Sequence, residues 1–323
     1  MKRAGRLLLS IALLFGIAGG APGEGPPPPA LVYLDHAITL LQQNSMDRGK
    51  VDWPVVRATA LRSAQGAATT ADTYSAIWYV IQALRDQHTS LVRPSAAELS
   101  EGTSTEVPTA RLLGDGIALF AIPGIRMDPA GERRYVDAGV AAVREMDKAA
   151  PCGWIVDLRH EDGGDMWPGI AVLAPLLGDG TLGFFVAPDG GRTEWTLRAG
   201  IGFSGGAVMT AEANTARLAQ PEPPLAVLTS GKTGSAGEAL LIAFRGLSRA
   251  RTSGRPTAGF ATGNIPFRLS DGAVLVVTTV RDADRTGRVY DNVPIQPDEP
   301  VATDDRAVDS ALAWLRTQPG CRA

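Results

Sequence analysis

Between Leu31 and about Leu91 the apolar residues recur every three or four positions, which is the spacing that one face of an α-helix produces. The first predicted helix carries Leu31, Leu34, Ile38 and Leu41 on one face. Two further segments of the same kind follow, from Trp53 to about Ser63 and from Thr73 to Leu84. The pattern therefore predicts a small helical N-terminal subdomain over residues 31–93.

Beyond this region, short apolar runs alternate with segments of helical spacing. Residues 94–108 contain mostly Ser, Glu, Gly and Thr between the two regions, which indicates a linker. We expect strands at 117–122, 154–158, 225–228, near 250 and at 273–280, a hairpin from 182–186 and 193–197, and helices at 136–146, 167–177, after 236 and at 307–315. Strands that alternate with helices indicate an α/β core over residues 109–323.

The first residues have the organisation of an export signal. Lys2, Arg3 and Arg6 precede an apolar run from Leu7 to Ile17, and small residues at 18–21 offer a cleavage site. The run is too short to span a membrane, which requires about 20 apolar residues, and no cysteine follows it to carry a lipid. The sequence predicts a signal peptide over 1–22, a Pro-rich leader over 23–30, and an exported protein, periplasmic or secreted, without a membrane anchor.

Composition excludes several function classes. The chain has 323 residues, a net charge of −3 and no basic block after its N-terminus, which argues against nucleic-acid binding. We find no His and carboxylate cluster with metal-ligand spacing and no phosphate loop, so we expect no metal and no other cofactor. Cys152 and Cys321 could pair in an oxidising compartment or remain free buried thiols, and the sequence leaves both open.

One stretch could carry a nucleophile. The predicted strand at 225–228 is followed by two glycines, and a predicted helix starts at Ala236, so Ser235 lies on a tight strand-to-helix turn. The amide of Ala236 is then one of the unpaired first donors of the helix, where the helix dipole favours negative charge. Alternatively, Ser235 is only an N-cap, because Glu238 three residues later completes a capping box.

A serine nucleophile needs a base and oxyanion donors. His36 lies within the first predicted helix, His88 lies at a turn after the helical subdomain, and His160 directly follows the predicted strand at 154–158. Gly163 and Gly164 follow His160 and allow backbone amides to approach a substrate closely. They could supply a second oxyanion donor, or they could form a plain strand-to-helix turn.

Four segments together resemble a known family. Their sequences are Val156-Asp-Leu-Arg-His-Glu-Asp-Gly-Gly164, Thr233-Gly-Ser-Ala-Gly-Glu238, Gly254-Arg-Pro-Thr-Ala-Gly259 and Pro294-Ile-Gln-Pro-Asp298. In this order they resemble the site segments of the C-terminal processing (tail-specific) serine peptidases. The resemblance implies a ClpP/crotonase-like α/β core, Ser235 as nucleophile, and an oxyanion hole formed by Gly163, Gly164 and Ala236.

The same resemblance separates two designs of the catalytic base. The Ser-Lys branch has its lysine directly after Gly259, where this chain has Phe260. The tricorn-like branch uses a histidine from an Asp-Gly-His-Ser/Thr turn, which Asp86-Gln-His-Thr89 matches except at Gln87. The resemblance therefore implies His88 as the base, with His160 and Lys232 as alternatives. It implies Asp291, shortly before the last segment, as the acid that orients the imidazole.

We therefore predict an exported serine endopeptidase that forms an acyl-enzyme, acts on a peptide or protein substrate and lacks a PDZ domain. Because His88 must be neutral to act as a base, activity should fall below about pH 6. The first alternative is a catalytically impaired relative that binds a peptide or apolar ligand in the same cleft, since Gln87, His160, Glu161, Phe260 and Pro294 depart from the family pattern. A second alternative is an esterase that uses the same residues. The sequence does not indicate an oligomeric state.

Overall fold

A computed structural model of the chain describes residues 29–94, 106–126, 129–210 and 214–321. Its helices are α1 Pro29–Asn44, α2 Trp53–Ser63, α3 Tyr74–Leu84, α5 Pro129–Asp147, α6 Met166–Leu177, α7 Ala236–Phe244 and α8 Asp305–Leu315. Its strands are β1 Ser90–Val92, β2 Thr109–Leu112, β3 Ile117–Ala121, β4 Gly153–Asp157, β5 Gly180–Val186, β6 Arg192–Arg198, β7 Ile201–Ser204, β8 Ala207–Val208, β9 Leu225–Thr229, β10 Ala250–Gly254, β11 Thr262–Arg268, β12 Val274–Asp284 and β13 Glu299–Pro300.

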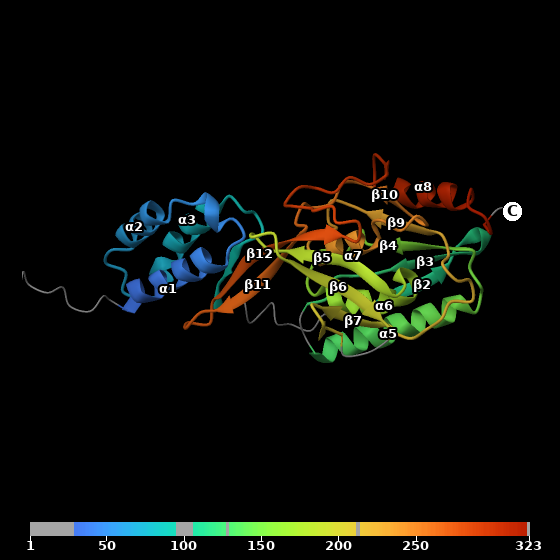
Figure 1. The fold of residues 1–323 in the computed structure, drawn as a ribbon, viewed down its shortest axis with the longest axis horizontal. Helices are drawn as coiled ribbons and strands as arrows, with labels where there is room; N and C mark the ends of the chain where they lie inside the picture. Colours follow the sequence, from blue (N-terminus) through green and yellow to red (C-terminus); the bar gives the residue numbers. More distant parts are fainter. Residues whose placement is uncertain (1–28, 95–105, 127–128, 211–213, 322–323) are drawn as a thin grey trace, which may run out of the picture.

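The larger end of the molecule contains a sheet with the strand order β13-β10-β9-β4-β3-β2. Strands β3, β4, β9 and β10 are parallel neighbours, and every residue of β4 and β9 is buried. Helices α5, α6 and α7 pack on one face of this sheet and α8 packs on the other (Figure 1). Strands covered on both faces explain the continuous apolar runs that mark these strands in the sequence.

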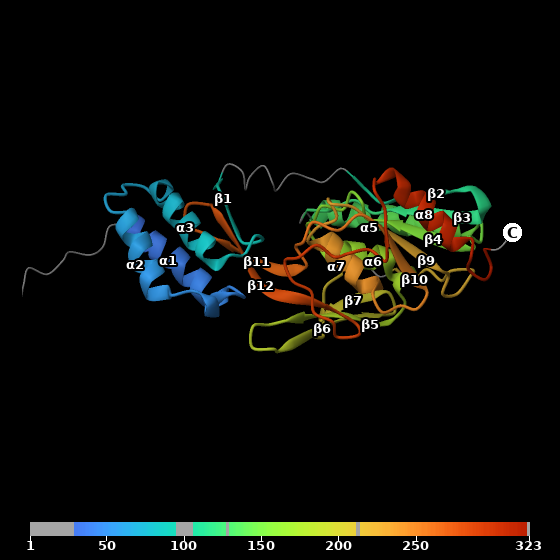
Figure 2. The same cartoon turned by 90° about the horizontal axis from the view of Figure 1, so that it is seen from above.

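A second sheet connects the two ends of the molecule. Its order is β1-β12-β5-β6-β7-β8, and β11 also pairs with β12. One end of β12 pairs with β1 at Val274–Val276, and the other end pairs with β5 at Arg281–Asp284. Figures 1 and 2 show the β11–β12 hairpin reaching from the large end to helices α1–α3. A strand from late in the chain therefore runs beside β1, which begins two residues after His88.

The helical end shares its hydrophobic core with this hairpin. Leu269, Ala273, Leu275 and Val277 belong to the same buried cluster as Leu34, Ile38 and Leu41 of α1 and the apolar face of α3. We predicted a helical subdomain from the local pattern of residues 31–93 alone. In the structure, those helices bury their apolar faces partly against strand residues that follow them by more than 180 positions.

Most predicted elements agree with the structure. The expected helix at 136–146 extends further, from Pro129 to Asp147, and the expected strand at 273–280 continues to Asp284. The hydrophobic pattern does not predict β11, which contains Pro266 and a polar Asn264 and lacks an apolar run. A proline is tolerated there because β11 pairs on one side only among the described residues, as an edge strand.

Two further expectations concern the ends of the chain. Cys152 and Cys321 form a disulfide, which joins the residue before β4 to the segment after α8. None of the described helices is both long and apolar enough to cross a membrane. The predicted signal peptide, nearly all of the predicted leader and most of the predicted linker lie outside the described residues.

Candidate active site

Ser235 occupies the turn between β9 and α7 in a strained backbone conformation. Its φ of 51° and ψ of −110° lie outside the regions that residues with a Cβ normally adopt. Such strain persists only where the surrounding structure enforces it, and it is concentrated at functional sites. The side chain is half-buried, so the turn presents a hydroxyl at the start of a fully buried helix.

Glu238 holds this turn in place. Its carboxylate is fully buried and accepts the Ser235 amide at 3.2 Å, as the predicted capping box requires. It also accepts the Gly259 amide at 3.0 Å, the Phe260 amide and the Thr257 hydroxyl. Burial raises the pKa of Glu238, and these four donors oppose the rise. A capping box requires only the bond to the Ser235 amide. The other three bonds of Glu238 connect the Ser235 turn to the loop that follows β10.

The loop after β4 is fastened to the same turn. The Thr233 hydroxyl donates to the Leu158 carbonyl at 2.8 Å, the Ser230 hydroxyl donates to the Arg159 carbonyl at 2.7 Å, and the Gly234 amide donates to the Glu161 carbonyl at 3.1 Å. These bonds bring the glycine pair of this loop against Ser235.

Gly163 and Gly164 could not be replaced without moving this loop. Their φ values are +119° and +117°. A Cβ on Gly163 would lie 3.3 Å from Ser235 Cβ, and one on Gly164 would lie 1.9 Å from the Ile125 carbonyl oxygen. The glycines thus allow the close approach that the sequence analysis expected.

The two glycines differ in their position relative to the cavity beside Ser235, because Gly164 lines it and Gly163 is not among its lining residues. Burial and the nearby Asp162 raise the pKa of the Glu161 carboxyl, two residues before Gly163, to about 8. The amides of Gly164 and Ala236 have no acceptor within the described part of the chain. Ser235, Gly164 and Ala236 line one cavity of about 310 Å³. The geometry favours Gly164 and Ala236 over Gly163 as oxyanion donors.

His88 lies in the turn between α3 and β1 and contacts a residue of the cavity lining. Its Nδ1 is 2.8 Å from the hydroxyl of Thr262, and Thr262 itself lines the cavity with Ser235. Its ring contacts the ring of Phe260 with the centroids 5.1 Å apart. Burial holds the pKa of the His88 imidazole below its usual value of 6.5, against the opposing charge of Asp86. A neutral imidazole at neutral pH is the form that a general base requires.

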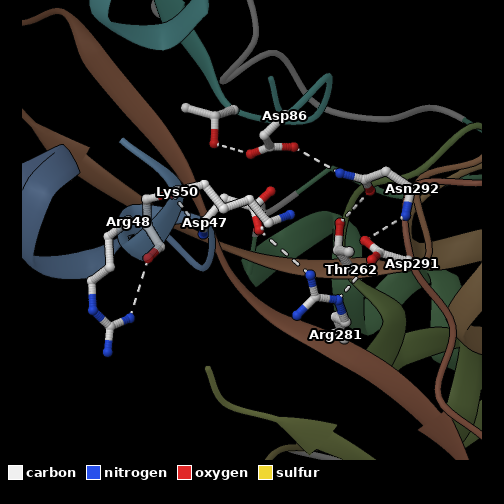
Figure 3. A network of polar contacts seen from close by, with 10 residues as sticks. Asp47, Arg48, Lys50, Asp86, Thr262, Arg281, Asp291 and Asn292 are labelled. Atoms are coloured by element: carbon white, nitrogen blue, oxygen red, sulfur yellow. Dashed lines mark hydrogen bonds and ion pairs between the residues drawn. The ribbon is translucent and has the colours of Figure 1, made fainter. Parts of the chain in front are cut away.

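A chain of hydrogen bonds fixes the tautomer of His88. The Asn292 side-chain amide donates to Asp86 at 2.7 Å, and the Thr262 hydroxyl donates to the Asn292 carbonyl oxygen at 2.9 Å (Figure 3). Because that hydroxyl has a single proton, its contact with His88 must be the acceptance of the Nδ1 proton. Nε2 is therefore the unprotonated ring nitrogen, which is the one that can take a proton.

Asp291, the expected orienting acid, has a different partner. Its exposed carboxylate binds Arg281 Nε at 2.8 Å, and Arg281 also contacts Asp47. Figure 3 shows Asp291 directed toward Arg281, while the neighbouring Asn292 faces Asp86 and Thr262. The side chain that contacts the His88 ring nitrogen is a hydroxyl, so the geometry does not support a carboxylate in the orienting position.

The alternative bases lie outside this arrangement. His160 and Lys232 both have exposed side chains, as does His36 on α1. Thr262 and Asn292 were not among the site residues predicted from the sequence. Asn292 is the residue after the predicted acid Asp291, so the resemblance pointed to the correct segment but to the neighbouring side chain. Thr262 lies on β11, a strand that the hydrophobic pattern does not predict. No group of His, Cys, Asp and Glu in the described ranges could hold a metal ion.

Comparisons with known proteins identify the family of the chain. Residues 132–301, more than half of the chain, match the family model described as Peptidase family S41. The nisin-resistance protein of Lactococcus lactis subsp. lactis is 27% identical over 90% of this chain and 89% of that protein. A carboxyl-terminal-processing protease of Synechocystis sp. is 28% identical over 60% of this chain but 41% of its own length.

Solved structures share the fold. A lipoprotein from Streptococcus agalactiae superposes with a TM-score of 0.79 at 24% identity and covers 93% of this chain and all of its own. A photosystem II D1 C-terminal processing protease superposes with a TM-score of 0.61 at 17% identity, over 86% of this chain and 94% of that one. The predicted fold class, an α/β core of the C-terminal processing peptidases with helices at its N-terminal end, is confirmed.

Proposed function

This chain belongs to peptidase family S41, which makes it a serine-type peptidase, and we propose that it is an exported endopeptidase in which Ser235 and His88 form and hydrolyse an acyl-enzyme. Ser235 Oγ attacks the peptide carbonyl carbon while its proton passes to His88 Nε2. The amides of Gly164 and Ala236 hold the oxygen that becomes negative. His88 then donates the proton to the leaving amine, and a water molecule releases the acyl group by the same steps.

One observation carries this assignment: Thr262 lines the cavity of Ser235 and receives the Nδ1 proton of His88. Thr262 connects His88 to the cavity that Ser235 lines. Because the Thr262 hydroxyl donates to Asn292, it accepts the proton of His88 Nδ1, and Nε2 is left unprotonated. In this proposal Thr262, Asn292 and Asp86 are positioning residues that do the work of the carboxylate in a Ser-His-Asp triad. An oxyanion donor contributes roughly 10²–10³ in rate, so the two unpaired amides are a second requirement of the mechanism.

Labelling with a fluorophosphonate probe tests the nucleophile and the base. Wild type should be labelled on Ser235, Ser235→Ala should not be labelled, and His88→Ala should be labelled much more slowly. Ser310→Ala, on the far side of the sheet in α8, is the matched control and should react like wild type. Labelling that persists in Ser235→Ala would exclude Ser235. A wild type that reacts with neither the probe nor peptides would favour the ligand-binding alternative.

Export is supported by the disulfide between Cys152 and Cys321, because disulfides persist in oxidising compartments. Expression of the full-length chain, followed by fractionation and mass spectrometry of the mature N-terminus, tests it. We expect a product that has lost its first 18 to 23 residues. A product that retains Met1 in the cytosol would contradict export and would leave the peptidase assignment untouched.

A further inference from the structure

The cavity beside Ser235 has apolar walls. Its apolar lining residues are Met166, Trp167, Phe185, Met209, Ala236, Ala239 and Pro266. Because Ser235, Gly164 and Ala236 line the same space, a side chain next to the attacked carbonyl would enter it. A volume of about 310 Å³ accommodates a long side chain. The cavity is therefore placed to select the residue on the acyl side of the scissile bond.

Asp282 of β12 also lines this cavity, and its carboxylate lacks a partner. The residue is 2% exposed, and its Oδ1 has no hydrogen-bond partner among the described residues. Its backbone is fixed on both sides, because its amide donates to the Ala261 carbonyl at 3.2 Å and its carbonyl accepts the Tyr290 amide at 2.8 Å. A buried polar group without a partner is costly. Such a group beside a nucleophile indicates a ligand that supplies the missing donor.

The titratable side chains on the cavity lining are both acidic. Asp165 is the other carboxylate on its lining, and it already accepts the Trp167 amide at 3.0 Å as the cap of α6. Among the described lining residues there is no lysine, arginine or histidine. Asn264 adds a second buried acceptor, since its Oδ1 also lacks a partner in the described part of the chain. The buried side-chain atoms of the lining that lack a partner in the described part of the chain are therefore both oxygens.

We infer that this cavity is a specificity pocket for a basic side chain, lysine or arginine, whose charged end binds Asp282. The apolar walls suit the methylene stem, and Asp282 and Asn264 offer acceptors to the ammonium or guanidinium donors. This inference rests on the proposed function, because the pocket is defined relative to Ser235. Burial and the nearby Glu238 raise the pKa of Asp282 well above its usual value. A cation bound beside Asp282 would lower this pKa and stabilise the ionised carboxylate.

Two measurements test the pocket. The first is cleavage by wild type of blocked hexapeptides that differ only at the acyl-side residue, which is lysine, norleucine or glutamate. Norleucine matches the stem of lysine and lacks the charge. We expect kcat/KM for lysine to exceed that for norleucine by roughly 30-fold or more, since a buried charge pair that loses one partner costs at least this much. The glutamate peptide should be the poorest.

The second measurement separates the pocket from catalysis. Ser235→Ala should bind, by calorimetry, a peptide that ends in lysine more tightly than one that ends in norleucine, because binding requires no nucleophile. Asp282→Asn preserves shape and removes the charge, so the ratio of its kcat/KM for the lysine peptide to that for the norleucine peptide should fall to within about threefold. Asp309→Asn, an exposed aspartate on α8, is the control for the same chemical change.

The outcomes distinguish the two proposals. Fluorophosphonate labelling of Ser235 with no preference for lysine in either measurement overturns the pocket and leaves the peptidase mechanism standing. Absence of labelling overturns the mechanism, and the binding of lysine peptides to Ser235→Ala still decides the pocket. A lysine preference that survives in Asp282→Asn would show that another group selects the cation and would refute the role of Asp282.

Discussion

Replacing Thr262 by valine removes the single hydroxyl between His88 and Asn292. Valine keeps the branched shape that β11 accommodates, so the change is confined to one O–H group. In wild type that oxygen lies 2.8 Å from His88 Nδ1 and 2.9 Å from Asn292 Oδ1 at a residue that is 3% exposed. The variant leaves the Nδ1 proton and the Asn292 carbonyl oxygen without their partner.

The size of the effect follows from burial. A buried group that loses its partner costs about 1–3 kcal/mol, and the bond to Nδ1 strengthens when His88 becomes a cation in the transition state. A loss of about 1.4–2.7 kcal/mol from the transition state alone lowers kcat by about 10- to 100-fold. KM should change little, because the methyl group of Thr262 is preserved.

The pH dependence of kcat/KM distinguishes a loss of His88 orientation from a general loss of structure in the variant. Because burial already holds the pKa of His88 below 6.5, the acid limb of wild-type kcat/KM should lie below pH 6.5. The variant stabilises the imidazolium less, so its acid limb should move to lower pH still. Thr262→Ser retains the hydroxyl and should recover most of the activity. Wild-type kcat together with an unshifted acid limb in Thr262→Val would refute the positioning role.

Three further predictions concern the surrounding groups. Glu238→Gln should lower the unfolding free energy, measured by urea denaturation, by about 2–4 kcal/mol, because an NH₂ group then faces buried donors. An unchanged urea midpoint of unfolding would contradict the conclusion that Glu238 holds the Ser235 turn and the loop after β10 together. The raised pKa of Glu161, about 8, means that wild-type stability should fall as the pH rises from 4.5 to 8, and thermal melting of Glu161→Gln should lack this slope. Asp291→Asn should leave kcat within about threefold of wild type, since a surface ion pair contributes about 0–1 kcal/mol; a loss of 100-fold or more would restore it as the orienting acid.

Many helices and strands of this fold could be predicted from the sequence because each depends on the pattern of a few consecutive residues. The boundaries of α2, the helical face of α1 and the buried runs of β4 and β9 all depend on periodicity over a few residues. The position of Ser235 was predictable for the same reason, since glycines, a small residue and the start of a helix are adjacent there. The strained φ and ψ of Ser235 add a reason for catalysis that the capping signal alone did not give.

The residues that orient His88 could not be predicted from local sequence. Thr262 and His88 are 174 residues apart, and Asn292 and Asp86 are 206 residues apart. Their contacts depend on the register of β12, which pairs with β1 at one end and with β11 along its length. Since a shift by one residue would turn every side chain of a strand to the opposite face, no local pattern specifies which polar residue meets the imidazole.

The sequence by itself indicated the class of chemistry, because the nucleophile turn, the glycine pair and the histidine turn are each formed by consecutive residues, and together they carry the resemblance to the serine peptidases. Only the tertiary structure decided that Thr262 rather than Asp291 contacts His88, that Gly164 and Ala236 line the cavity beside Ser235, and that Asp282 Oδ1 has no partner there among the described residues. These facts depend on which strands become neighbours. Neighbouring strands are selected by burial of the whole apolar surface, which is a property of the folded chain and not of any segment.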